Sequence, residues 1–201
     1  MSSKKNQEEN EIKSIKYGII YQNSPLIKIS ELFQFYFEKS NPNIIKNEEN
    51  EYEFTLNDND NLHYIFTVIA EESMNNLVNI YSRLNFFLIF IDVQNKESLT
   101  NLELYIDKLI ACSETVTKKS YIFGAFKNIN NIIYNDERIS AVLNCKGVEY
   151  EYSEIDIHLN EDFPKGVDYI IDDSKEIMEE RAVEEIKDNM EKEKARSCVI
   201  F

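Results

Sequence analysis

Short apolar runs alternate along the chain with longer stretches in which apolar residues recur at helical spacing. The short runs predict strands over residues 15–21, 52–56, 62–69, 86–93, 120–126 and 148–155. The longer stretches predict helices over residues 29–39, 76–84, 99–110, 167–190 and the second half of 130–147. Strands that alternate with helices indicate an α/β fold, with a mostly parallel six-stranded sheet covered by helices on both faces.

Individual residues predict where some of these elements end. Ser98 is the expected N-cap of the helix over 99–110, and Gly147 is expected to stop the helix that precedes it. Between residues 41 and 61 the chain is rich in Asn, Asp and Glu on either side of the strand over 52–56. That composition predicts loops on both sides of this strand.

Length and composition predict one domain with two short ends. The chain has 201 residues, 43% of them hydrophobic, which is enough for one core. Residues 1–14 are polar and without periodicity, so we expect a disordered leader there. The domain is expected over 15–190, and the charged residues 191–201 are expected to form a flexible tail.

Charge and hydropathy argue against nucleic-acid binding, a membrane-spanning segment and secretion. Asp and Glu number 37 against 22 Lys and Arg, which gives a formal charge of −15 and argues against binding to nucleic acid. The longest apolar run, Phe86 to Ile91, is far shorter than the roughly 20 residues that cross a bilayer. The polar start lacks the apolar core of a signal peptide, so a cytosolic or cytosol-facing protein is expected.

The last four residues carry the sharpest motif. Cys198-Val199-Ile200-Phe201 matches the C-a-a-X pattern of protein prenyltransferases, and a terminal Phe favours geranylgeranyl. We therefore predict lipidation of the Cys198 thiol. The alternative is that an apolar terminal strand happens to contain a cysteine.

A single lipid predicts weak anchoring. One chain gives reversible membrane binding, and few cations and no second cysteine lie close to Cys198 to strengthen it. We expect a protein on the cytoplasmic face of a membrane that exchanges with the cytosol. Its expected partners are a prenyltransferase, a carrier that masks the lipid, and effector proteins.

One internal segment adds a family resemblance. Residues 86–109, FFLIFIDVQNKESLTNLELYIDKL, resemble the fourth strand and following helix of the Ras superfamily, and most of all its Rab branch. The resemblance implies a small-GTPase-like fold over most of the chain. It also implies five motifs that would bind GTP or GDP together with Mg²⁺.

The phosphate-loop motif GxxxxGK[ST] falls on residues 22–29. Lys28 keeps the lysine position, but Gln22 and Ile27 replace the two glycines, and Ile29 stands where a hydroxyl should hold Mg²⁺. Ser30 lies one residue late for that role. Lys28 and Ser30 are therefore the only candidate nucleotide-binding residues in this window, and the alternative for Lys28 is an ordinary solvated lysine at a helix start.

The other four motifs are also altered. The resemblance aligns Phe66, Ile69 and Ala70 with the Asp, Gly and Gln that serve Mg²⁺, the terminal phosphate and the attacking water. Ser40 is the only hydroxyl in the effector-loop window. The guanine motif falls on 125–128, where Asn128 replaces an aspartate, and Ser-Ala-Lys falls on Glu154, Ile155 and Asp156.

These changes favour a prenylated, Rab-like pseudo-GTPase that acts as a membrane-tethered binding module in vesicle traffic. It would have no catalytic residues and no metal site. The first alternative is a divergent GTPase with slow hydrolysis that still uses Lys28 and Ser30, with GTP or GDP and Mg²⁺ as cofactors. The second is a prenylated scaffold whose α/β domain only echoes the family.

Overall fold

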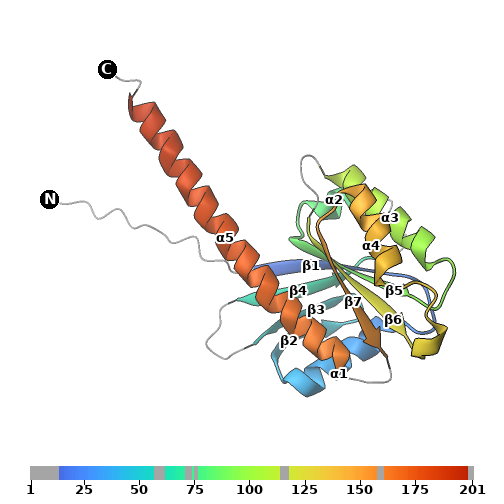
Figure 1. The fold of residues 1–201 in the computed structure, drawn as a ribbon. Coiled ribbons are helices and arrows are strands. Elements are labelled where there is room, and N and C mark those ends of the chain that lie inside the picture. The colour runs from blue at the N-terminus through green and yellow to red at the C-terminus, as the bar shows by residue number, and fades with distance from the viewer. Residues whose placement is uncertain are drawn as a thin grey trace.

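A computed structural model describes residues 14–56, 62–70, 74, 77–113, 118–157 and 161–198, with side chains as far as 192. The described chain forms an α/β domain of three layers, a central sheet between two layers of helices (Figure 1). One long C-terminal helix continues beyond the domain (Figure 1).

The sheet has seven strands in the order β2-β3-β4-β1-β5-β6-β7. Their bounds are β1 Ser14–Tyr21, β2 Asn43–Glu48, β3 Glu51–Thr55, β4 His63–Val68, β5 Phe86–Asp92, β6 Ser120–Phe126 and β7 Tyr150–Asp156. The pairs β4-β1, β1-β5, β5-β6 and β6-β7 are parallel, and β2-β3 and β3-β4 are antiparallel. The sheet is therefore mixed, with its antiparallel part at one edge.

Helices cover both faces of the sheet. Their bounds are α1 Ile29–Ser40, α2 Leu77–Tyr81, α3 Ser98–Cys112, α4 Asp136–Lys146 and α5 Asp162–Cys198, with a short 3₁₀ helix, η2, at Ile129–Asn131. α1 and α5 pack on one face, and α2, α3 and α4 pack on the other (Figure 1).

The alternation of side chains along the buried strands separates the core into two halves. On β5, Phe86, Leu88 and Phe90 face α1 and α5, whereas Phe87 and Ile89 face the opposite helices. Both faces of this strand are covered, which explains why its sequence is apolar without a break.

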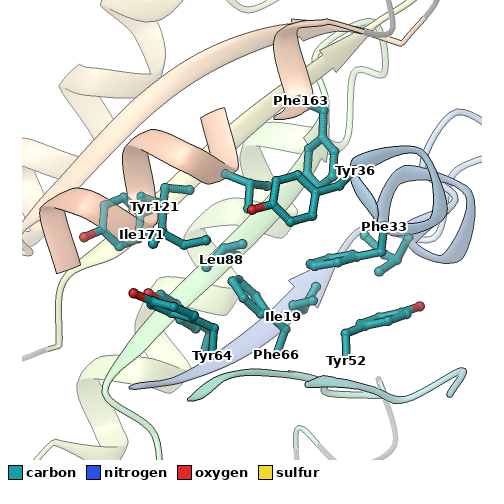
Figure 2. Packing of buried hydrophobic residues seen from close by; sticks show 14 of the residues in the cluster. Ile19, Phe33, Tyr36, Tyr52, Tyr64, Phe66, Leu88, Tyr121, Phe163 and Ile171 are labelled. Carbon is teal, nitrogen blue, oxygen red and sulfur yellow. The ribbon is translucent and has the colours of Figure 1, made fainter. Parts of the chain in front are cut away.

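The half of the core beneath α1 and α5 is rich in aromatic rings (Figure 2). Phe33 of α1 stacks on Tyr52 of β3 with 4.3 Å between ring centroids, and Tyr17 stacks on Phe66 at the same distance. Stacked pairs of this kind add about 0.5–1.5 kcal/mol each beyond their burial.

Tyrosine hydroxyls fasten the first half of α5 to the domain. Three buried tyrosines, from β1, α1 and β6, hydrogen-bond to α5: Tyr17 to Ser174, Tyr36 to Asp168 at 3.1 Å, and Tyr121 to Asp173 at 2.5 Å. The last described contact of this face of α5 is the Arg181 guanidinium, which lies 5.7 Å from the centre of the Phe86 ring. Beyond it the helix runs away from the domain (Figure 1).

The predicted α/β class and the helical cover on both faces are confirmed, but the predicted count of six strands is wrong. The additional strand is β2, which lies in a segment predicted as a loop. Ile44 and Ile45, its only apolar residues, are both about half exposed. β2 is held by its antiparallel ladder with β3 rather than by burial, so it carries no alternating pattern.

The start of α3 and both ends of α5 also differ from the prediction. Ser98 is the first residue of α3 and not its N-cap; Glu97 holds that position and forms no side-chain cap. The Ser98 hydroxyl instead points into the domain, to Gln22 and Asp92. α5 begins five residues earlier than predicted and continues to Cys198, through residues assigned to the tail. Gly147 ends α4 as predicted, with a left-handed φ of 66°.

Candidate functional site

The loops that follow the parallel strands meet at one edge of the sheet. This edge carries the β1–α1 loop, residues 22–28, together with the ends of β5, β6 and β7. In open α/β sheets, ligands bind at the carboxyl ends of the strands, so this edge is the place to look for a site.

Four buried polar side chains form a closed network at this edge. Gln22 and Ser24 come from the β1–α1 loop, Asp92 ends β5, and Ser98 begins α3; their exposed fractions are 3%, 7%, 7% and 0%. Gln22 Oε1 accepts from the Asp92 backbone N–H at 3.0 Å and from the Ser98 hydroxyl at 2.7 Å. The Ser24 hydroxyl donates to Asp92 Oδ2 at 2.7 Å.

The backbone of the β1–α1 loop is also used internally. The N–H groups of Leu26 and Ile27 donate to Ser24, to its hydroxyl at 3.2 Å and its carbonyl at 3.1 Å. The Gln22 N–H donates to the Phe90 carbonyl at 2.9 Å, and Pro25 has no N–H. A phosphate-binding loop needs several free N–H groups that converge on one point. Here three of those groups are bonded within the protein and a fourth is missing.

Lys28 and Ser30 lie where the sequence predicts, at the start of α1, and both are on the surface. Lys28 is the N-cap of α1, and its Nζ pairs with Glu31 Oε1 at 2.8 Å on the surface. Ser30 is exposed on the first turn. A helix N-terminus attracts anions, and here the Glu31 carboxylate already supplies that charge.

The end of β4 is apolar. Phe66 is fully buried against the Tyr17 ring, and Ile69, 3% exposed, donates its backbone N–H to the Ile19 carbonyl at 2.8 Å. Ala70 is exposed. This part of the edge therefore presents core side chains where a metal-binding carboxylate and a phosphate-sensing glycine would stand. Glu71 and Glu72 lie outside the described residues.

The loop after β6 is held by hydrogen bonds within the loop and to Gln94. The Asn128 side chain accepts from the Asn130 N–H at 3.0 Å and caps η2. Gln94 bridges this loop, since its Oε1 accepts from the Lys127 N–H at 2.9 Å and its Nε2 donates to the Asn128 carbonyl at 2.9 Å. Asn128, which stands at the position of the guanine-binding aspartate, is thus engaged in local hydrogen bonds.

Of the remaining candidates, Ser40 and Glu154 form local contacts, whereas Ile155 and Asp156 lie at the end of β7 and line a cavity at this edge. Ser40 ends α1, about 16 Å along the helix from Ile29, and hydrogen-bonds to Tyr36. On β7, the Glu154 carboxylate accepts from the Tyr152 hydroxyl at 3.3 Å and Ile155 is buried. Burial is also the main reason why the pKa of Tyr152 is raised.

One cavity of about 320 Å³ opens beside the loop. Its lining is polar and apolar in about equal measure, and the apolar part comes from α1, the end of β7 and the start of α5, among them Leu32, Ile157 and Phe163. The lining also holds two positive and two negative side chains, those of Lys28, Lys127, Glu31 and Asp156. Because these charges balance, the cavity offers no net positive charge to a polyphosphate.

The network at the edge was not predicted from sequence. Gln22 was recognised only as the replacement of a glycine, and Asp92 only as part of the resemblance to Rab proteins. Polar residues directly after buried strands were the available signal, but the contact between Gln22 and Asp92 joins positions 70 residues apart. Cys198, the predicted lipid site, ends α5, and Val199 to Phe201 lie outside the described residues.

Within the described residues, no group of three or more His, Cys, Asp or Glu side chains could hold a metal ion. The described helices also include none that is both long enough and apolar enough to cross a membrane. Neither the models of known protein families nor the curated proteins contain a match to the chain.

Proposed function

We propose that this protein is a prenylated, Rab-like pseudo-GTPase that acts as a membrane-tethered binding module in vesicle traffic without a nucleotide switch. The observation that carries the proposal is the closed network of Gln22, Ser24, Asp92 and Ser98. These side chains and the bonded loop backbone fill the place of a phosphate cradle.

The topology supports the small-GTPase part of the proposal. Without β2, the strand order is β3-β4-β1-β5-β6-β7, with one antiparallel strand at the edge and a helix in each later crossover. A small GTPase has this arrangement. The resemblance of residues 86–109 to Rab proteins covers β5 and most of α3, so sequence and topology agree on the same segment.

The geometry of α5 is compatible with a lipid on Cys198. α5 has 37 residues, which corresponds to a helix about 55 Å long, and Cys198 is its last residue. The part after Arg181 would hold the domain about 25 Å from a lipid-bearing end. A geranylgeranyl group there would leave the whole domain surface accessible to effector proteins on the cytoplasmic side.

Nucleotide binding is tested first, by thermal unfolding of the unprenylated full chain with GTP or GDP and Mg²⁺ at millimolar concentration, with ATP as a control. A ligand bound with micromolar affinity, in thousandfold excess, adds about 4 kcal/mol, or roughly 8–16 °C for a chain of this size. We expect no shift. A shift of that size that is lost in Lys28→Ala would instead support the slow, divergent GTPase.

Lipidation is tested separately with purified geranylgeranyltransferase and mass spectrometry. We expect one geranylgeranyl group on the wild-type chain and none on Cys198→Ser, whereas Cys145→Ser, which alters an exposed cysteine of α4, keeps it. Phe201→Ser should shift the preference towards farnesyl. Modification that survives Cys198→Ser would end the lipid part of the proposal and leave the nucleotide part intact.

A further inference from the structure

The outer part of α5 carries an apolar stripe that the domain does not cover. Val183, Ile186 and Met190 are 50%, 49% and 54% exposed, and their spacing of three and four residues puts them on one face of the helix. In Figure 1 this part of α5 has left the domain. We call these three side chains the outer stripe.

The outer stripe faces away from the surface that α5 uses to pack on the sheet. Ser174 marks the packing face, because it is fully buried against Tyr17. At about 100° per residue, Val183 and Met190 lie roughly 180° and 160° around the helix from Ser174. The stripe is therefore not a continuation of the packing face.

Carboxylates extend the same face towards the domain. Glu176, Glu179 and Glu180 precede Val183 by seven, four and three residues. With Val183, Glu184 and one cation, Lys187, they line a shallow hollow of about 460 Å³. From 176 to 192 there are seven carboxylates and three cations. None of the described side chains in this range forms an ion pair. The surface combines an apolar end with an acidic end.

Like-charged pairs between residues 176 and 184 weaken helix α5. Glu176 and Glu180, and Glu180 and Glu184, are like-charged pairs four residues apart, which weaken a helix by a few tenths of a kcal/mol each. An occupant that covered the stripe and neutralised the carboxylates would stabilise the helix.

Charge decides which occupant fits. A second copy packed in parallel would bring the same carboxylates close together, and an anionic membrane surface would repel them. We propose that the outer stripe, with Glu176, Glu179 and Glu180, docks a basic amphipathic helix of a partner protein. Its apolar residues would cover Val183, Ile186 and Met190, and its Lys or Arg side chains would pair with the carboxylates.

This docking surface goes beyond the proposed function and does not depend on it. The surface lies on the part of α5 outside the domain, away from the β1–α1 loop. Nucleotide binding or a missing lipid would leave it unchanged.

The test uses the unprenylated full chain and a synthetic helical peptide of about three heptads, with Leu at positions a and d and Lys or Arg at e and g. A matched peptide carries Glu at e and g. Fluorescence anisotropy measures affinity, and hydrogen exchange measures protection of the amides of 183–192. We expect saturable binding of the basic peptide, with protection of these amides, and no binding of the acidic peptide.

Variants give the decisive comparison. Ile186→Ser and the double variant Glu179→Lys with Glu180→Lys should each weaken binding at least about tenfold. Glu185→Lys with Asp188→Lys makes the same change in net charge on the side away from the stripe, and should change affinity less than about twofold. Circular dichroism checks that every variant keeps its helix content.

Four outcomes would overturn the proposal. The basic peptide could fail to bind, or the two double variants could weaken it equally, which would indicate only long-range attraction. The chain alone could be a dimer in sedimentation that Ile186→Ser dissociates, which would make a second copy the occupant. Binding to anionic vesicles that Ile186→Ser abolishes would make the membrane the occupant.

Discussion

Replacing Gln22 with methionine tests the closed network at the edge of the sheet. Methionine has nearly the same length as glutamine and is flexible enough to fill the same space, but its thioether is a poor acceptor. The substitution therefore removes the acceptor at the centre of the network and changes the packing little. Gln22 is 3% exposed, so water cannot easily replace the lost partner.

The structure allows the size of the effect to be worked out. Gln22 Oε1 accepts two hydrogen bonds, from the Asp92 N–H at 3.0 Å and from the Ser98 hydroxyl at 2.7 Å. The Ser98 hydroxyl keeps a second acceptor, the Asp92 carbonyl, so only the Asp92 N–H is left without a partner. A buried donor without a partner costs about 1–3 kcal/mol. We expect a loss near 2 kcal/mol, or about 4–8 °C in Tm.

Urea unfolding followed by circular dichroism measures the difference, with the slope of the transition used to check that the cooperativity is unchanged. The matched control is Gln34→Met on α1. The Gln34 amide donates to Glu38 at 3.2 Å, but on the exposed face of the helix. Surface changes of this kind usually stay within about 0.5 kcal/mol.

The comparison between the two variants can refute the reasoning. If Gln22→Met unfolds at the same urea concentration as Gln34→Met, the Gln22 amide does not hold the loop together. The network would then not be what keeps this edge closed, and the main support for a pseudo-GTPase would be lost.

Three further predictions concern stability. Tyr17→Phe removes a hydrogen bond to α5 and should lower the free energy of unfolding by about 1 kcal/mol in the same urea assay. Tyr52→Phe removes a buried hydroxyl without a partner and should be neutral or stabilising. A larger loss of stability in Tyr52→Phe than in Tyr17→Phe would contradict this reasoning. Lys28→Ala breaks an exposed pair and should change the urea midpoint by less than about 0.5 kcal/mol, so a larger loss would indicate a buried role. Burial raises the pKa of the Tyr36 and Tyr121 hydroxyls above 10.0, so the unfolded chain releases these protons first. The free energy of unfolding should therefore fall as the pH rises above about 10, and unchanged urea midpoints there would exclude this linkage.

Much of the fold follows from the apolar pattern, because burial on both faces leaves a direct trace in the sequence. β5 and β6 are fully buried, and both lie within a residue of their predicted bounds. The sequence of β2 has no such apolar pattern, since this strand is held in place by backbone pairing with β3. α5 continues past Met190 on Glu, Lys and Ala, which favour helix without forming an apolar stripe.

The candidate site was less predictable, for a physical reason. The altered positions, such as Gln22 and Phe66, could be located along the chain, but what replaces a ligand there depends on contacts between distant elements. Ser98 illustrates the difficulty. Its position before an apolar helix is typical of an N-cap, and only the buried Gln22 amide beside it explains why its hydroxyl turns inward.

A single substitution in the β1–α1 loop should not create a nucleotide site. Gln22→Gly would introduce the first glycine of the phosphate motif, but it would remove the acceptor that satisfies Asp92 and Ser98, so we expect a chain less stable by about 2 kcal/mol. Lys28 would still pair with Glu31, and the Leu26 N–H would still donate to Ser24 Oγ within the loop. Thermal unfolding of this variant should show no stabilisation by GTP and Mg²⁺. A GTP-dependent rise in its Tm would mean that one glutamine alone blocks the site, and that the rest of the loop can still bind phosphate.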